Sequence, residues 1–312
     1  MTEADSLREI SMPESAEGMR FDSALALELG ISRSAVEDIF ESGDCIWAVD
    51  GEEVKKSDRV KVGDKIRVLL RSKESHSVES APLPVIFEDS DIVVVAKAIG
   101  YAAHPSPGWS GPTVIGALKE SGVQIAHVGS EEREGIVHRL DVGTSGLMVV
   151  AKSERAYSSL KDQFRSREVK KIYHALAQGH LDPAVGTIDA PIDRHPKEDH
   201  RFAVVASGKP SVTHYEAIEF FPAVTLARIE LETGRTHQIR VHFNAIKHPL
   251  VGDLVYGADP RLAERLAMKR PWLHAMELEF RHPITGERVH FSAPYPPDLE
   301  ESLASLRRSI GG

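Results

Sequence analysis

The pattern of hydrophobic and polar positions divides the chain into two structured parts. Residues 1–16 are polar and acidic and lack apolar periodicity, so we expect them to form a disordered leader. Residues 17–72 contain two short amphipathic helices followed by strand-like segments that end at Gly-containing turns, a pattern typical of a small α/β domain. Residues 73–83 are rich in Ser and Glu, which predicts a linker to a larger domain over residues 84–312.

Strand-like segments dominate the larger domain. Residues 92–96 and 147–151 are apolar runs that predict buried strands, and residues 227–231 alternate as in a strand with one buried face. Residues 156–164 carry apolar side chains at helical spacing. Because strands outnumber helices and no βαβ alternation is visible, we predict an α+β fold with a mainly antiparallel, mixed β-sheet.

Three local features carry sharper predictions. We expect Asp22 or Ser23 to cap the first helix and Gly30 to end it, because such residues favour helix starts and left-handed helix ends. Residues 59–62 are predicted to form a strand. Thr236 is expected to cap a helix with three apolar residues on one face, namely Ile239, Phe243 and Ile246.

The composition is that of an ordinary soluble globular protein, with 41% hydrophobic and 27% charged residues. No apolar run approaches the ~20 residues that a membrane helix needs, and the polar, acidic N-terminus is unlike a signal peptide. Cys45 is the only cysteine, which excludes an intramolecular disulfide and CxxC metal sites. We therefore expect a cytoplasmic protein without a membrane partner.

The charge of the chain is unevenly distributed. The formal net charge is −9, which by itself argues against a nucleic-acid partner. Residues 152–171, however, hold seven basic and three acidic residues, a local balance of +4. Such a stripe can bind a phosphate backbone, although a solvated helix face would have the same composition.

Residues 135–147 form the densest polar cluster of the sequence. Apolar, strand-like residues flank His138, Arg139 and Asp141, and glycines allow the connection to turn tightly. Catalytic groups are often found on such connections. The alternative is a turn in which Asp141 or Thr144 bonds only to its own backbone.

The run HRLDVGTSGLMVVAKS at residues 138–153 resembles the catalytic motif of the RluA/RluC/RluD family of pseudouridine synthases. The resemblance covers roughly residues 84–296, and an ordered series of motifs is far more specific than any single one. Ala98 departs from the family, which usually has proline there, and we expect this change to touch no catalytic position. Further segments resemble the family in the same order: FEDSDIVVVAKAIGYAAHPSPG, VKKIYHALAQG, LETGRTHQIRVHFNAIKHPLVGDLVYG and LHAMELEFRHPITGE.

The resemblance implies an isomerase that converts uridine into pseudouridine in RNA without a metal or other cofactor. In the matching positions, Asp141 would act on the nucleoside as a covalent nucleophile or by assisting a glycal-like intermediate. Tyr173 would stack on the extruded uracil and help to remove the C5 proton. Arg240 would offset the desolvation of Asp141 through a bidentate ion pair.

The same resemblance implies how RNA is held. The uridine must leave the helical stack, and Arg139 would enter the space that it vacates. His138 would support this loop or contact a phosphate. Separately from the resemblance, the basic stripe described above predicts phosphate contacts from Arg165, Arg167, Lys170 and Lys171. Support of the pocket or of Arg240 is expected from Arg235, Thr236, His237 and Gln238.

Residues 17–72 resemble a second family, the small RNA-binding domain first seen in ribosomal protein S-four, in which Arg20 and Arg33 would contact RNA. Residues 1–76 nevertheless hold eleven basic and seventeen acidic residues, a balance of −6. Weak RNA binding by this domain is therefore expected.

Two other classes of protein remain as alternatives. A metal-dependent hydrolase could use His195 with His200 or His237 with His242, but a spacing of five residues does not place two imidazoles together on a helix face. A non-catalytic RNA-binding ribosome-assembly factor is the other alternative. For the enzyme, an S-four-type domain favours large-subunit (23S) ribosomal RNA as the substrate, with transfer RNA as the alternative. We expect the enzyme to be a monomer.

Overall fold

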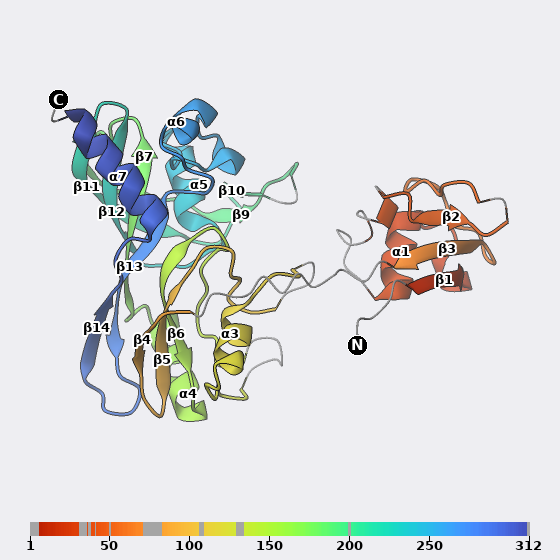
Figure 1. Ribbon diagram of the computed structural model, residues 1–312, viewed down its shortest axis with the longest axis horizontal. Helices are drawn as coiled ribbons and strands as arrows, with labels where there is room; N and C mark the ends of the chain where they lie inside the picture. Colours follow the sequence, from red (N-terminus) through yellow and green to blue (C-terminus); the bar gives the residue numbers. More distant parts are fainter. Residues whose placement is uncertain are drawn as a thin grey trace. The chain divides into compact units, whose positions relative to one another are not determined.

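The computed structural model describes residues 6–30, 36, 39–40, 42–49, 51–70, 83–105, 109–128, 134–198 and 201–310. The chain divides into two compact units (Figure 1). The small unit comprises Met1–Glu79 with Pro105–Gly111, and the large unit comprises Ser80–His104 with Pro112–Gly312.

The small unit is built on a three-stranded antiparallel sheet with the strand order β1-β3-β2. Its core contains Phe21 and Leu25 of the first helix, and the ring of Phe21 lies edge-on to Trp47 at 5.0 Å. Its elements are β1 (Ser6–Ser11), η1 (Glu14–Ala16), α1 (Phe21–Leu29), β2 (Cys45–Trp47) and β3 (Lys65–Leu70).

Several predictions for this unit need correction. Residues 6–16 are not a disordered leader, because β1 pairs with β3 along its whole length and Met12 is buried in the core. In β1 only Ile10 packs against the core while Leu7 is exposed, so its sequence shows no alternation of apolar and polar residues. Residues 59–62 form no strand, only an isolated bridge from Arg59 to Arg20.

The boundaries of α1 are partly as predicted. The helix ends at Gly30, whose φ of 64° is left-handed, which confirms that prediction. It begins two or three residues earlier than expected, with Arg20 at the N-cap and no side-chain cap hydrogen bond. Most of the second predicted helix, including Arg33, lies outside the described residues, as does the predicted linker apart from Leu83.

The large unit has a nine-stranded sheet with the order β4-β5-β6-β13-β7-β12-β11-β8, and β14 pairs with β13. The pairing is antiparallel throughout except between β13 and β6. This arrangement confirms the predicted α+β fold with a mainly antiparallel, mixed sheet. Its strands are β4 (Val85–Glu88), β5 (Ile92–Lys97), β6 (Ser145–Ala151), β7 (Lys170–Gln178), β8 (Val185–Asp189), β11 (Val212–Phe221), β12 (Val224–Leu231), β13 (Leu273–Arg281) and β14 (Arg288–Ser292), with a separate hairpin of β9 (Ile192–Arg194) and β10 (Phe202–Val204).

Helices cover this sheet where its strands present apolar side chains. Helix α4 lies against β6, and α7 lies along β11 (Figure 1). Ala156 and Leu160 of α4 pack on β6, and Leu303 of α7 packs with Phe221 and Trp272. Within the described ranges, no helix is long and apolar enough to cross a membrane. The helices are α3 (Val114–Glu120), α4 (Glu154–Arg165), α5 (Gln238–Ala245), η3 (Leu254–Tyr256), α6 (Pro260–Arg265) and α7 (Pro297–Ile310).

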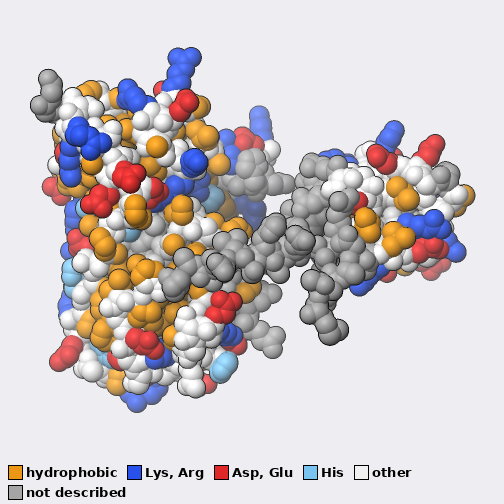
Figure 2. Space-filling view, in the orientation of Figure 1, with side chains coloured by type: hydrophobic (Ala, Val, Ile, Leu, Met, Phe, Trp, Pro, Cys, Tyr) orange, Lys and Arg blue, Asp and Glu red, His pale blue; other side chains and the backbone are white. Residues whose placement is uncertain are grey.

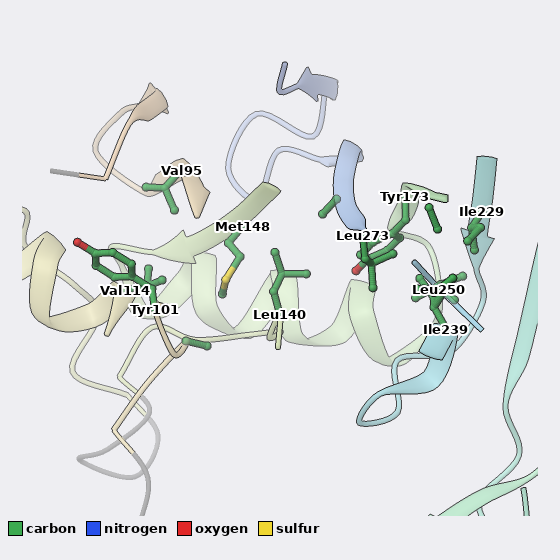
Figure 3. Packing of buried hydrophobic residues seen from close by; sticks show 14 of the residues in the cluster. Val95, Tyr101, Val114, Leu140, Met148, Tyr173, Ile229, Ile239, Leu250 and Leu273 are labelled. Atoms are coloured by element: carbon green, nitrogen blue, oxygen red, sulfur yellow. The ribbon is translucent and has the colours of Figure 1, made fainter. Parts of the chain in front are cut away.

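One continuous apolar cluster joins the middle of the sheet to α5. Figure 3 shows Tyr173, Leu273 and Ile239 close together at one end of the cluster, with Leu140 and Met148 between them and α3. Interiors packed in this way hold side chains in fixed rotamers. The polar loop that follows Leu140 is therefore anchored on a rigid base.

Candidate active site

A cavity of about 600 Å³ opens where the loop before β6, the end of α4, β7 and the loop before α5 meet. Two acidic residues, Asp141 and Glu232, line it. They are outnumbered by the basic lining residues Arg139, Arg165, Arg167, Lys171, Arg235 and Arg240. A cavity with this excess of positive charge attracts a polyanion although the whole chain is acidic.

Asp141 occupies the loop between Leu140, which is buried, and β6. The loop is closed by a backbone hydrogen bond from Thr144 N–H to the Asp141 carbonyl, 3.0 Å long. Gly146 has a φ of 120°, and a Cβ there would collide with the backbone of Ala275, so glycine lets β6 lie against β13. The Asp141 side chain is 18% exposed and faces Arg240 and His237, so it does not bond only to the backbone of its own turn.

The bidentate partner of Arg240 is Asp253, and the predicted bidentate pair with Asp141 is wrong. Arg240 Nε and Nη2 donate to the Asp253 carboxylate at 2.7 and 2.8 Å. The remaining nitrogen, Nη1, lies 3.7 Å from Asp141 Oδ2, which is an ion pair without a hydrogen bond. The guanidinium also lies over the ring of Tyr256, 4.8 Å from its centroid. Arg240 is thus fixed from the side of η3 and presents one edge to Asp141.

Tyr173 lies on β7 and lines the cavity, and its side chain is largely buried. Burial, and secondarily the negative charge of Asp141, raises the pKa of its hydroxyl far above the ordinary value. The phenol is therefore neutral at physiological pH. It packs beside Leu273 and Ile239, which holds the ring on the wall of the cavity that Asp141 shares (Figure 3).

The loop before α5 is fixed by Gln238, and the predicted cap at Thr236 is wrong. The N-cap is His237, which has a left-handed backbone and no side-chain cap hydrogen bond. Gln238 Oε1 accepts hydrogen bonds from Thr233 Oγ1 and from the backbone N–H of Arg235. Gln238 therefore supports the pocket by joining the helix to the preceding loop, while Thr236 and Arg235 line the cavity.

His138 supports the loop that carries Asp141. Its Nε2 accepts a hydrogen bond of 3.0 Å from the backbone N–H of Val149, and its ring stacks on Phe164 at 4.6 Å. Burial, assisted by the nearby charge of Lys171, lowers the pKa of His138 to about 3. A neutral imidazole with these contacts holds the loop, which agrees with the first of the two roles expected for His138. Arg139, in contrast, is exposed at the cavity.

Three of the four basic residues that were expected to contact phosphates line the cavity. Arg165 and Arg167 are exposed on its lining, and Arg167 adopts a left-handed φ of 61° just after α4. Lys171 is half-buried there, and burial lowers its pKa to about 8. Lys170 is exposed but does not line the cavity.

Two residues of this site were not singled out from the sequence. Asp253 and Tyr256 both lie in the segment LVGDLVYG, where an acidic residue after glycine looks like an ordinary turn. Asp253 is nevertheless only 1% exposed in the structure. A buried carboxylate needs a partner, but the sequence gives no indication that this partner is Arg240.

Lys97 was also missed, and the turn beside Ala98 is closer to the site than expected. The Lys97 ammonium is buried and donates hydrogen bonds to the carbonyl groups of Ala98 and Tyr101, at 2.9 and 3.0 Å. The carbonyl of Val142, next to Asp141, lies 3.5 Å away. Burial lowers the pKa of Lys97 to about 7, although the charge of Asp141 opposes this effect. The turn is thus tied to the loop that carries Asp141.

The small unit offers weaker support for RNA contacts than the basic lining of the cavity does. Arg20 forms a bidentate ion pair with Asp22, with a shortest distance of 2.7 Å, so its charge is already matched. Arg33 lies outside the described residues. On the face that Figure 2 shows, acidic and basic side chains are interspersed over this unit.

The histidines considered for a metal site have other partners. His242 bonds to Thr213 and to the carbonyl of Ala190, whereas His237 bonds to Tyr256. His195 lies 3.8 Å from Glu198, and His200 is outside the described residues. In the part of the chain that the structure describes, no group of three or more His, Cys, Asp or Glu residues could hold a metal ion.

Several pseudouridine synthases are similar to this chain in sequence and in fold. Residues 91–245 match the family described as RNA pseudouridylate synthase. An uncharacterised RNA pseudouridine synthase of Mycobacterium bovis is 50% identical over 304 residues, which covers 96% of this chain and 98% of that protein. The ribosomal large subunit pseudouridine synthase D of Xanthomonas campestris pv. campestris is 41% identical over 314 residues, covering 97% and 93%. The solved structure of human RNA Pseudouridylate Synthase Domain Containing 1 matches with a TM-score of 0.57 and 28% identity, covering 74% of this chain and 95% of that chain.

Together with the fold, these comparisons identify an RNA-modifying isomerase. The chain belongs to the RNA pseudouridine synthase family, in the RluA/RluC/RluD branch that its motifs resemble.

Proposed function

We propose that this enzyme isomerises specific uridines of large-subunit (23S) ribosomal RNA, with Asp141 as the reacting carboxylate. The observation that carries the assignment is the placement of Asp141 in a cationic cavity beside Arg240 and Tyr173. During the reaction the bond from ribose C1′ to uracil N1 breaks and a bond from C1′ to C5 forms. The proton lost from C5 is balanced by a proton gained at N1, so the product is an isomer.

Each of the three residues has a distinct part in this proposal. Asp141 attacks the nucleoside or assists formation of a glycal-like intermediate. Arg240 stabilises the Asp141 carboxylate, whose charge would otherwise be costly in a pocket that RNA closes to water. Tyr173 is neutral, so it can stack on the extruded base and help to move the C5 proton.

RNA binding in the proposal follows the basic lining of the cavity. Arg139 is the exposed residue two positions before Asp141, where it can fill the space left by the flipped uridine. Arg165, Arg167 and Lys171 lie where a phosphate backbone can be neutralised. The small unit adds a second contact with RNA in this proposal.

Ribosomal RNA is favoured over transfer RNA by the relatives that share nearly the full chain. One of them is named a ribosomal large subunit pseudouridine synthase and matches the small unit as well as the large one. The test is to map pseudouridines by carbodiimide treatment and primer extension in a strain that lacks this gene. Loss of a large-subunit signal, restored by the wild-type gene, supports the proposal, whereas loss confined to transfer RNA contradicts the substrate.

A further inference from the structure

His237 has an unusual backbone that aims its ring into the cavity. Its φ of 56° and ψ of 20° are left-handed, a conformation that costs free energy for residues other than glycine. The position is held on both sides, because its carbonyl accepts from Val241 N–H and the side chain of the next residue, Gln238, is buried and hydrogen-bonded. These hydrogen bonds hold the backbone of His237 in this conformation and keep its imidazole at the wall of the cavity.

A chain of two hydrogen bonds favours one tautomer of His237. The backbone N–H of Phe202 donates to the Tyr256 hydroxyl at 3.1 Å. That hydroxyl lies 2.8 Å from His237 Nδ1. Since the phenol oxygen already accepts from an amide, its own hydrogen is available for Nδ1, and the neutral ring then carries its proton on Nε2.

We propose that His237 is a positioning residue that holds the Asp141 carboxylate in its reactive orientation through a proton fixed on Nε2. This atom lies 3.9 Å from Asp141 Oδ2, and Arg240 Nη1 lies 3.7 Å from the same oxygen. Neither contact is a hydrogen bond in the free enzyme, but hydrogen bonds of an active site are often long before substrate binds and tighten in the complex. In that complex the two donors converge on Oδ2, which leaves Oδ1 for the nucleoside. The inference rests on the proposed role of Asp141.

The tautomer matters because the other one would turn a lone pair toward a carboxylate. A neutral N–H donor orients Asp141 without adding a second positive charge beside Arg240. Burial lowers the pKa of His237, and Arg240 and Arg139 act in the same direction against the opposing charges of Asp141 and Asp253. A further charged neighbour is Arg201 of the β9–β10 hairpin, whose guanidinium lies over the Tyr256 ring at 5.3 Å.

The tautomer can be read directly without RNA. Full-length protein with ¹⁵N-labelled histidine is examined by long-range ¹H–¹⁵N correlation, and the His237 signals are identified by their loss in His237→Asn. Asparagine tolerates a left-handed backbone, so this variant is expected to fold. The wild type should show a protonated Nε2 and an unprotonated Nδ1, and Tyr256→Phe should give a mixture of tautomers. A proton on Nδ1 in the wild type, or no change in Tyr256→Phe, would overturn the inference.

The second readout is turnover, measured as tritium release from a large-subunit ribosomal RNA transcript labelled with [5-³H]uridine. His237→Asn should lower kcat roughly 10- to 100-fold, the scale of one lost hydrogen bond to a charged group, with RNA affinity unchanged. His237→Gln, whose amide nitrogen can reach the position of Nε2, should recover part of that loss. Equal kcat in the two variants contradicts a donor role.

The pH dependence separates this role from a general loss of structure. In Tyr256→Phe, activity should rise as the pH falls below the ordinary histidine pKa of about 6.5, because an imidazolium carries a proton on Nε2 in every case. Burial lowers the pKa of His237, so the rise should begin below that ordinary value. The double variant Tyr256→Phe/His237→Gln should show no such rise, and its presence there overturns the assignment to His237. If the wild type releases no tritium, the proposed function fails, while the ¹⁵N spectrum still decides the tautomer.

Discussion

Asp253 holds the guanidinium of Arg240 with two hydrogen bonds, 2.7 and 2.8 Å long, while Arg240 comes no closer than 3.7 Å to Asp141. Asp253 is 1% exposed and directly precedes η3, so the cation is fixed before any substrate arrives. One guanidinium therefore links two carboxylates, one structural and one at the cavity.

The first prediction is that Asp253→Asn impairs both stability and turnover. The variant leaves the buried Arg240 charge with a weaker partner, which should cost about 1–3 kcal/mol in the free energy of unfolding. Because Arg240 is then free to shift, kcat should also fall by an order of magnitude or more under conditions where the protein stays folded. Urea unfolding and tritium release measure the two effects.

A distant bidentate pair provides the control for this prediction. Glu219 and Arg307 form an exposed pair at 2.6 Å on β11 and α7, away from the cavity lining. Glu219→Gln should leave both kcat and stability close to wild type. A normal kcat in Asp253→Asn would show that Arg240 does not depend on this anchor.

The second prediction concerns the basic residues at the cavity. If Arg165 and Arg167 contact phosphates, replacing both by Gln should reduce the slope of log affinity against log salt by about 0.7–0.9 per contact. Arg155 and Lys161 belong to the same stripe but do not line the cavity, so their double replacement by Gln is the matched control. An unchanged slope in the Arg165/Arg167 variant would assign both residues to a solvated helix face.

The third prediction is an acid sensitivity caused by His138. The unfolded chain binds a proton at this residue below its ordinary pKa of about 6.5, whereas the folded protein, in which burial lowers the pKa, does so only near pH 3. Between these values the unfolded state holds more protons, so the free energy of unfolding falls as the pH falls. His138→Gln retains an acceptor for Val149 N–H and should flatten the dependence by up to about 1.4 kcal/mol per pH unit.

Urea unfolding at several pH values between about 7 and 4 checks this effect. The control is His290→Gln, because the His290 side chain is 53% exposed and pairs with Glu277 on the surface. Equal slopes in wild type and His138→Gln would show that His138 is charged in the folded protein.

The sequence predicted strands such as those over residues 92–96 and 147–151, because these apolar runs are buried on both faces. β1 could not be recognised in this way. Of its side chains, Ile10 packs against the small core while Leu7 is 65% exposed, so the strand looks like polar coil. Its structure depends on pairing with β3, which lies far along the sequence.

The sequence also predicted only part of the candidate active site. Asp141, Tyr173 and Arg240 were found through the family resemblance, and the structure brings them to one cavity. The resemblance did not indicate that Asp253 anchors Arg240, because a bidentate pair depends on where the residues before η3 lie in three dimensions. Thr236 was chosen as a cap from residue preference alone, whereas the left-handed backbone of His237 determines the start of α5.

The fourth prediction separates the two units. A truncated protein that starts at Pro82 keeps Leu83 and the whole core of the large unit, so it should fold alone. If the small unit adds only a second RNA contact, turnover on saturating RNA should persist and the half-saturating RNA concentration should rise modestly. Loss of all turnover in a truncated protein with a native circular dichroism spectrum would mean that the small unit helps to build the active site.

The most direct test of the central claim is tritium release from [5-³H]uridine-labelled RNA by Asp141→Asn. The substitution keeps the shape of the side chain and removes its charge, and Arg240 remains held by Asp253. We predict that turnover vanishes while RNA affinity stays near that of the wild type. Tritium release by the pure Asp141→Asn protein at a measurable rate would contradict the assignment of Asp141 as the reacting carboxylate.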